Sequence, residues 1–307
     1  MRYQRGVAAV TAILIVAVAA SAAAVMLSRQ SAMLDQSMLV VARAQADLYA
    51  QAGIDWARGV LDQDRQASAI DTLAEGWAQP IAGLPVERAV VAGDIADEQV
   101  KLNLNDLVQG SARSDADVRA FGRLLSGLGL SPELAEAVLD WIDADQDLAG
   151  PGGAEDSYYL ALARPYRAPN APMTQVEELY RIRGFDAASV AKVKPFVTAL
   201  PARTTVNLNT ASDRVIAAVL DLPLDKAQLL VAERGRSPFA STQDLSDRAR
   251  KIGLDAIASG AVDVKSDFFS VRVRVVQDDV QLASEALLRR GAAPPSGTAI
   301  VWRRPRY

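Results

Sequence analysis

The stretch Val7–Leu27, which reads VAAVTAILIVAVAASAAAVML, decides the architecture of the chain. It carries no charged residue, and only Thr11 and Ser21 have polar side chains. At about 1.5 Å of rise per residue, a helix of this length spans about 30 Å, which is the thickness of the hydrocarbon core of a bilayer. Because a helix satisfies its own backbone hydrogen bonds in lipid, the stretch predicts a membrane-spanning helix.

A short basic segment, residues 1–6, precedes the apolar run. It contains Arg2 and Arg5, and such cations keep this end of the chain on the cytoplasmic side of the membrane. The part of the chain beyond Arg29 is therefore expected to be exported. An ordinary cleaved signal peptide fits poorly, because the apolar run exceeds the usual span of about 7–15 residues and no small-residue cleavage site interrupts the helical pattern.

The helical pattern continues after the apolar run. Apolar residues recur every three, four or seven positions, which is typical of one face of a helix, and proline is absent as far as Gln79. We therefore predict one helix over residues 7–62, whose second half lies on a globular domain. The predicted contact stripe consists of Leu34, Met38, Val41, Leu48, Ala52, Trp56 and Val60.

Composition excludes several classes of function. The formal net charge of the 307 residues is −4, which argues against non-specific binding of nucleic acid. The chain has no Cys and no His, which excludes disulfides and catalysis by Ser–His–Asp or Cys–His groups and argues against a zinc site. A metal would therefore need oxygen ligands, as calcium and magnesium do.

A small antiparallel sheet is predicted from both ends of the exported part. After the helix, residues 86–92 and 98–105 read as strands, and Gly93-Asp94 reads as the turn between them. Near the C-terminus, alternating apolar and polar residues predict a three-stranded meander. Its expected strands are residues 268–277, 280–290 and 298–303.

These signals together predict an α+β fold. A long transmembrane helix packs on the small antiparallel sheet, and a large all-helical domain is inserted between the two parts of that sheet. The predicted divisions are a leader over 1–6, a helix over 7–62 with its transmembrane part over 7–27, a sheet domain formed by 63–105 and 262–307, an inserted helical domain over 106–203, and a second helical repeat over 204–261.

The helical region contains an internal repeat. Residues 102–105 read LNLN, and residues 206–209 read VNLN. Because further matches follow in the same order, we interpret the region as two copies of one folding unit. These matches pair 128–135 with 220–227, 174–179 with 241–245, and Val193-Lys194 with Val264-Lys265.

Each copy resembles the helix-hairpin-helix unit, a SAM-like fold, and residues 207–211 (NLNTA) fit its usual N-x-N-T-A opening. In DNA-binding members, glycines of the hairpin present backbone amides to a phosphate. Here the hairpins read GLGL over 127–130 and LDLP over 220–223. Because the second hairpin has no glycine and carries Asp221, which would repel phosphate, we favour a packing unit over a DNA clamp.

An acidic segment within the stretch 141–172 predicts a cation site. Carboxylates this dense repel one another unless a cation lies between them, and flexible loops of oxygen ligands suit calcium. The segment begins like an EF-hand, but Leu148 and Ala154 stand where that motif requires Gly and Glu. The alternative is a solvated acidic loop without a metal. The candidate ligands are Asp143, Asp145, Asp147, Glu155 and Asp156.

The start of the apolar run resembles the class III leader of type IV pilins and type II secretion pseudopilins. Residues 5–11 read RGVAAVT, and the resemblance implies that a prepilin peptidase cuts between Gly6 and Val7 and that Val7 is then N-methylated. The fifth residue after this cut is usually Glu in the family, but here it is Thr11. The minor pseudopilin K branch lacks this Glu and carries a helical insertion with a calcium-binding acidic loop, so the whole chain is similar to that branch.

The resemblance implies a pilin-like fold and a role in protein export rather than catalysis. The implied protein caps the tip of the type II secretion pseudopilus with the minor pseudopilins I and J, next to the major pseudopilin. It is anchored by one helix in the bacterial inner membrane, with its C-terminal part in the periplasm. No nucleic-acid partner is expected. Two alternatives stay open: a membrane-anchored DNA receptor of the competence type and a minor type IV pilin.

Overall fold

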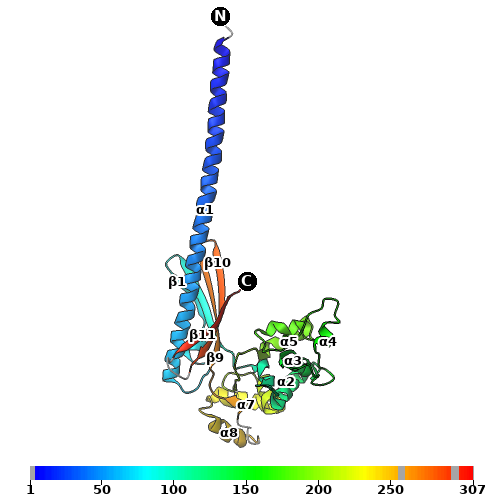
Figure 1. The fold of residues 1–307 in the computed structure, drawn as a ribbon. Coiled ribbons are helices and arrows are strands. Elements are labelled where there is room, and N and C mark those ends of the chain that lie inside the picture. The colour runs from blue at the N-terminus through cyan, green and yellow to red at the C-terminus, as the bar shows by residue number, and fades with distance from the viewer. Residues whose placement is uncertain (1–3, 255–259, 292–296, 307) are drawn as a thin grey trace.

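The computed structural model describes residues 4–254, 260–291 and 297–306; Arg2 of the predicted leader lies outside them. One helix, α1 (Gln4–Ala67), extends far beyond the rest of the molecule and ends alongside a sheet. A helical region is attached to the end of this sheet that is farthest from the N-terminus (Figure 1). The expected combination of a long apolar helix, an antiparallel sheet and further helices is confirmed.

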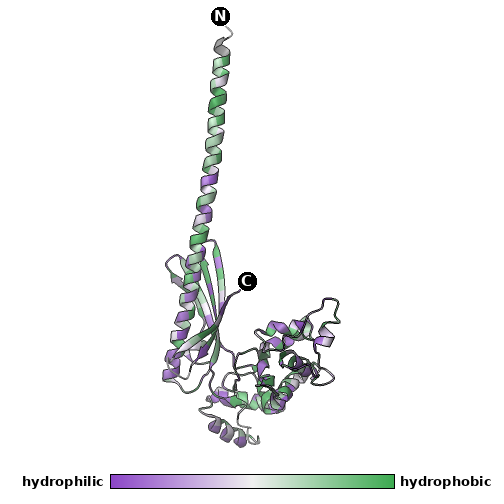
Figure 2. Cartoon of the chain, in the orientation of Figure 1, coloured by the Kyte–Doolittle hydropathy of each residue, from purple (hydrophilic) through white to green (hydrophobic). Residues whose placement is uncertain are grey.

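Helix α1 is unbroken over 64 residues, and its part over Val7–Leu27 carries no charged side chain (Figure 2). The predicted contact stripe was wrong, because Leu48 and Trp56 are 64% and 53% exposed. The face against the sheet instead carries small side chains, which let the helix approach closely: a Cβ added to Gly53 would lie 3.1 Å from Val273 Cγ1. The buried residues of this face are Ala46, Ala50, Ile54, Ala57 and Leu61.

The sheet joins two distant parts of the chain. Its antiparallel order is β1-β2-β9-β10-β11, so that β2 pairs with β9 across the whole helical region. The three strands predicted near the C-terminus are confirmed, and the last is longer than expected. The strands are β1 (Ile81–Val86), β2 (Ala89–Asp97), β9 (Phe268–Gln277), β10 (Val280–Arg290) and β11 (Thr298–Pro305).

The first hairpin was predicted with the wrong turn. Its turn is Glu87-Arg88, with Glu87 at φ 51°, whereas Gly93 lies inside β2. Glycine is required there for close approach, because a Cβ on Gly93 would lie 2.7 Å from the carbonyl oxygen of Arg272 on β9. Pro85 is accommodated within β1 because β1 is an edge strand of the sheet. Of the predicted second strand only Leu102–Asn103 (β3) is extended.

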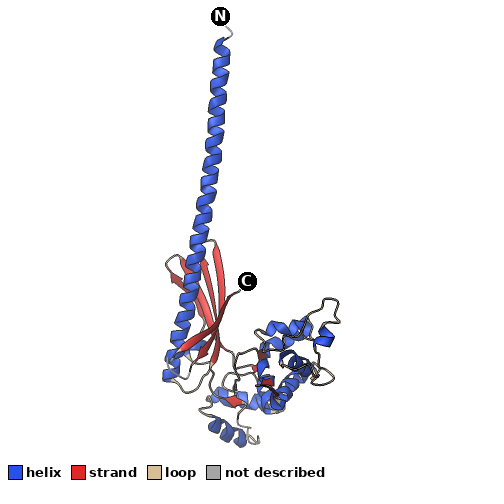
Figure 3. Cartoon of the chain, in the orientation of Figure 1, coloured by secondary structure: helices blue, strands red, loops and turns tan. Residues whose placement is uncertain are grey.

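The helical region is built from short helices (Figure 3). They surround one continuous hydrophobic core, which includes residues of both predicted copies. Its α-helices are α2 (Asp115–Gly127), α3 (Leu134–Ile142), α4 (Asp156–Tyr159), α5 (Ala187–Val193), α6 (Asp213–Leu220), α7 (Leu224–Arg236) and α8 (Thr242–Lys251). The 3₁₀ helices are η1 (Gly76–Ala78), which contacts α1 and β2, then η2 (Leu104–Leu107), η3 (Val176–Arg181) and η4 (Lys194–Phe196). The short strands are β3, β4 (Val108–Gln109), β5 (Ala112–Arg113), β6 (Val197–Thr198), β7 (Val206–Asn207) and β8 (Val262–Asp263).

The asparagines of the two copies make equivalent contacts. The side chain of Asn105 donates to the carbonyl of Met173 (2.9 Å) and accepts from its N–H (2.7 Å). Asn209 holds Phe239 by the same pair of bonds, at 3.0 and 2.8 Å. Each copy also closes with a parallel strand pair, β3 with β6 and β7 with β8. Each asparagine therefore fixes the backbone of a distant segment of its own copy.

The two hairpins are equivalent as well. Gly129 and Asp221 both have left-handed backbones (φ 70° and 54°). In each hairpin the next residue donates its N–H to the carbonyl five positions earlier, from Leu130 and from Leu222. The predicted match of 128–135 with 220–227 therefore aligns equivalent positions.

The final predicted match of the repeat was out of register. The parallel strands β6 and β8 place Val197 opposite Leu102 and Val262 opposite Val206. Val197 and Val262 are therefore the equivalent residues, rather than Val193 and Val264.

Candidate functional site

Three of the five predicted ligands meet in one cluster. Carboxylate oxygens of Asp143, Asp145 and Glu155 lie within 4.8 Å of one another. Asp143 follows the last residue of α3, and Glu155 precedes the first residue of α4. The chain between these helices therefore folds back and brings together two acidic segments that are separated in sequence.

The other two predicted ligands lie outside this cluster. Asp156 accepts hydrogen bonds from Arg167 Nη1 (3.0 Å) and from the N–H of Ala168 (3.1 Å), so its carboxylate holds the returning arm of the loop. Asp147 is exposed, and its N–H donates to Asp145 Oδ1 (2.9 Å). Asp156 and Asp147 therefore make hydrogen bonds within the loop and lie outside the cluster.

Asp140 is a further acidic residue beside the cluster, and sequence reasoning missed it. It is fully buried, and its Oδ1 accepts from the N–H of Ala149 (2.9 Å). Its Oδ2 has no hydrogen-bond partner among the described residues, and the same is true of Asp143 Oδ1 and both carboxylate oxygens of Glu155. Buried carboxylate oxygens without donors are costly, and this donor set of hard oxygens fits a calcium ion.

Two carboxyl groups of the cluster, those of Glu155 and Asp143, have raised pKa values. Burial raises the pKa of Glu155 to about 8, and repulsion from Asp140 and Asp143 adds to this. Burial and the charge of Asp145 raise the pKa of Asp143 to about 6. A divalent cation among these groups would supply the opposite charge that the surrounding protein lacks.

Glycines allow the loop to pass close to the acidic groups. A Cβ on Gly153 would collide with Asp140 Oδ2, and a Cβ on Gly152 would collide with the carbonyl of Glu133. Arg183 contacts the loop at two points. Its Nη1 donates to the carbonyl of Gly153 (2.6 Å), and its guanidinium lies 5.1 Å from the centre of the Tyr158 ring. The backbone therefore lies against α3 only because these positions lack side chains.

A cluster of aromatic side chains packs within the acidic loop and against α3. Trp141 and Tyr159 pack edge to face with ring centres 5.3 Å apart, and Tyr159 stacks on Tyr166 at 5.3 Å. The Tyr166 hydroxyl donates to the carbonyl of Arg181 (2.6 Å). The acidic loop is thus packed against a cluster of aromatic side chains.

A second acidic group, Asp64, Asp71 and Glu75, is also compact. Here the protein supplies its own cation, because Arg290 pairs with Asp64 (3.1 Å) and with Asp71. Glu75 accepts from the N–H of Thr72 and from the indole of Trp77, both at 2.8 Å. This group ties the end of α1 to β10 and offers no comparable metal site.

The N-terminal part of α1 is the second candidate site. Within the described residues, α1 is the one helix long and apolar enough to cross a membrane. The hydroxyl of Thr11 donates to the carbonyls of Val7 and Ala8, both at 3.0 Å, and is thereby satisfied inside the helix. Thr11 therefore needs no external partner, unlike a carboxylate at this depth.

Comparison with known proteins identifies the family. The family model described as type II secretion system (T2SS), protein K, matches residues 100–202 and 206–265. The type II secretion system protein K of Pseudomonas aeruginosa is 33% identical, over 94% of this chain and 90% of the relative. That of Klebsiella pneumoniae is 32% identical, over 94% and 93%. The chain belongs to the type II secretion system protein K family.

A solved structure shows the same fold as this member of the protein K family. A chain of the GspK–GspI–GspJ complex from enterotoxigenic Escherichia coli superposes with a TM-score of 0.73 at 24% identity, covering 86% of this chain and 97% of that chain. The predicted resemblance to the pseudopilin K branch is confirmed.

Proposed function

We propose that the protein is a minor pseudopilin that caps the tip of the type II secretion pseudopilus. The observation that carries the proposal is the similarity to proteins K over nearly the whole chain, 33% identity over 94% of it. The role is structural, since the acidic cluster lacks an accompanying nucleophile. The competence-type receptor and the type IV pilin are not favoured by any feature of the described residues.

The surface of α1 supports assembly with other pseudopilins. Beyond the predicted membrane span, residues 28–45 carry large apolar side chains that nothing covers within the described chain. Such a surface requires partner helices. The solved relative is part of a complex with GspI and GspJ, and we propose the corresponding minor pseudopilins as partners here, with the major pseudopilin below them. The uncovered side chains are Met33, Leu34, Met38, Leu39, Val40 and Val41.

The position at the tip rests on shape and on Thr11. The helical region lies at the end of the sheet farthest from the membrane helix (Figure 1), and its bulk would obstruct lateral repetition down a packed fibre. A subunit at the tip has no neighbour above it whose amino terminus needs a carboxylate, which suits Thr11. We further propose two helix-hairpin-helix copies as the content of this region, serving as packing units rather than as a DNA clamp.

Processing and localisation follow from the anchor. We propose that prepilin peptidase cuts between Gly6 and Val7, that Val7 is N-methylated, and that the mature chain spans the inner membrane once with its globular part in the periplasm. The single apolar helix of the described chain supports one membrane crossing.

We propose calcium as the ion of the acidic cluster. Asp140, Asp143, Asp145 and Glu155 would hold it with carboxylate oxygens, and the ion would neutralise their mutual repulsion. Its role would be to fix the loop between α3 and α4, so that the helical region presents a defined surface at the tip.

The proposed function is tested by co-purification. The full chain is co-expressed with the minor pseudopilins I and J of the same genome, extracted in detergent and isolated through a tag on this chain. Recovery of all three in one complex is expected. Recovery of this chain alone, with retention on DNA, would instead support the competence-type receptor.

A further inference from the structure

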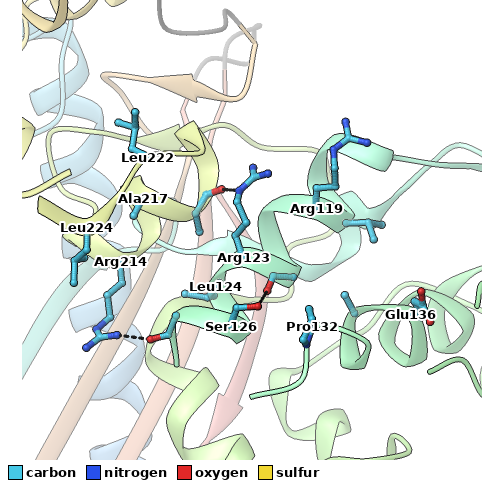
Figure 4. A pocket seen from close by; sticks show the side chains of 15 residues that line it. Arg119, Arg123, Leu124, Ser126, Pro132, Glu136, Arg214, Ala217, Leu222 and Leu224 are labelled. Carbon is cyan, nitrogen blue, oxygen red and sulfur yellow. Dashed lines mark hydrogen bonds between the residues drawn. The ribbon is translucent and has the colours of Figure 1, made fainter. Parts of the chain in front are cut away.

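A basic groove runs between the two copies of the helical unit. It has a volume of about 600 Å³ and is lined by residues of α2, α3, α6 and α7 (Figure 4). Helices α2 and α6 form its base and run antiparallel, because Arg123 Nε of α2 donates to the carbonyl of Ala218 and Arg214 Nη1 of α6 donates to the carbonyl of Gly127, both at 2.8 Å. The groove is therefore created by the way the two copies pack.

The floor of the groove is apolar. Val118, Leu124 and Ala135 contribute buried surface, while Leu222 and Leu224 come from the second hairpin and the start of α7. Leu224 is 40% exposed. Apolar side chains that stay exposed in a groove often mark a surface that a partner covers. The groove thus offers apolar contact area at the place where the two copies meet.

The rim of the groove is cationic although the chain as a whole is acidic. Three arginines line it, Arg119, Arg123 and Arg214, against one lining acid, Glu136. Arg123 also pairs with Asp221 beside the groove (3.4 Å), so Arg119 and Arg214 carry most of the excess positive charge. Glu136 is engaged elsewhere, since its Oε2 accepts from the N–H of Gly152 (2.8 Å) on the acidic-loop side. Arg119 is exposed and has neither a hydrogen bond nor an ion pair with the described part of the chain. Its charge is available to an incoming group.

We propose that this groove docks an acidic amphipathic segment of a partner protein. Apolar side chains of the segment would lie on the floor, and its carboxylates would face Arg119 and the arginines beside it, as in helix-in-groove recognition. Arginine is well suited to this, because its guanidinium forms paired hydrogen bonds with a carboxylate. The groove's volume of about 600 Å³ lies within the usual range of ligand-binding pockets, about 300–1,000 Å³.

The same surface is a poor fit for a nucleic-acid backbone. In the second hairpin, Pro223 removes one backbone N–H that could otherwise bind a phosphate. An apolar floor also contributes nothing to phosphate binding. The charge and the floor together favour an acidic peptide.

The proposal is tested by selection from a peptide library. A phage-displayed library of helical peptides is panned on the detergent-solubilised full chain, and the affinity of enriched peptides is measured by fluorescence anisotropy. We expect amphipathic peptides rich in Asp and Glu. Arg119→Glu and Leu224→Ser should each weaken their binding by about tenfold or more.

Two matched variants control for indirect effects. Arg274→Glu makes the same charge change on an exposed position of β9, and Leu229→Ser makes the same truncation on α7 at a leucine that is 44% exposed and outside the groove. Both should bind the peptides like the unchanged chain. The proposal is overturned if no acidic peptides are enriched, if the control variants lose as much affinity as the groove variants, or if a DNA duplex binds the groove in an Arg119-dependent way.

Discussion

The hydroxyl of Thr210 donates a hydrogen bond to the carboxylate of Asp97 across 2.7 Å, and both side chains are buried. Asp97 is the last residue of β2, and Thr210 lies in the second helical copy. The same carboxylate accepts from Ser266 Oγ (2.7 Å), Asn207 Nδ2 (3.2 Å) and the N–H of Gln99 (2.8 Å). One carboxylate thus joins the sheet to the helical region.

Replacing this carboxylate should destabilise the protein. Asp97→Ala leaves several buried donors without an acceptor, so we expect the free energy of unfolding to fall by about 3 kcal/mol. Urea denaturation of the full chain in detergent, followed by tryptophan fluorescence, measures this. Asp279→Ala, at an exposed position of the β9–β10 turn, is the control and should change stability by less than about 0.5 kcal/mol. Equal losses in the two variants would contradict the proposed role of Asp97.

The acidic cluster should make calcium stabilisation depend on pH. The folded chain keeps a proton on Glu155 up to a pKa of about 8, whereas the ordinary pKa is 4.5. Between these values the folded state binds more protons than the unfolded state, so without a cation this group's contribution to stability falls as pH rises. Calcium should therefore raise the melting temperature more at pH 8 than at pH 5.

The control for this pH dependence is a variant without the titrating group. Glu155→Gln, measured with chelator, should show a shallower fall of melting temperature between these two pH values. The buried carboxyls Asp97 and Asp106 also have raised pKa values, about 6 and about 7, but they lie outside the cluster and give the same slope with and without calcium. A calcium effect that is equal at both pH values would speak against the cluster as the site.

Calcium affinity should depend on residues at the cluster and not on acidic residues outside it. Asp140→Asn removes a buried anionic oxygen, and we expect about tenfold weaker binding or more, because calcium affinity follows the number of charged ligands. Asp147→Asn changes an exposed residue outside the cluster and should leave affinity unchanged. Isothermal titration calorimetry on the full chain measures both. A larger loss from Asp147→Asn than from Asp140→Asn would assign the ion to another part of the loop.

Leader processing should depend on Gly6. Gly6→Ala adds a side chain directly before the proposed cleavage bond, and we expect the leader to stay attached. Mass spectrometry of the N-terminal peptide distinguishes the uncut chain from one that begins with methylated Val7. Gly59→Ala is the control, because an added Cβ there meets no atom within 4 Å and the helix is kept. Normal cleavage of Gly6→Ala would remove the pilin-type processing.

The length of the pseudopilus should respond to Thr11. Thr11→Glu supplies the carboxylate with which another subunit could be added beyond the tip, so longer pseudopili are expected. Electron microscopy of pseudopili sheared from cells measures their length, with Thr11→Ser as the control that keeps the hydroxyl. Unchanged length in Thr11→Glu would count against Thr11 as a determinant of capping.

Much of the fold was readable because its signals are local. The anchor follows from composition alone, and strands β9 and β10 follow from strict alternation. The turn at Glu87-Arg88 could not be predicted from the sequence, because neither residue is a usual turn former. Gly93 was the stronger turn candidate, and it lies inside a strand instead. Gly93 is explained only by β9, which is distant in sequence.

The candidate site was only partly predictable for a related reason. The acidic residues around Asp143 stood out in sequence, but which of them converge depends on how the loop returns to α3. Asp140 gave no signal, because it lies inside the largely apolar helix α3, before the acidic segment begins. The contact face of α1 was also misread, since hydrophobicity points to Trp56 while close packing selects alanines such as Ala50.

Helix α1 contains no proline along its whole described length, and it continues from the membrane span to the base of the sheet without a break. If the N-terminal segment of α1 is displaced along the helix axis, the sheet at the other end is displaced with it. This follows because a continuous helix resists compression far better than a flexible linker does. About 25 Å of helix separates the bilayer from the sheet. A displacement of the N-terminal end of α1 along its axis would thus move the sheet and the helical region by the same distance.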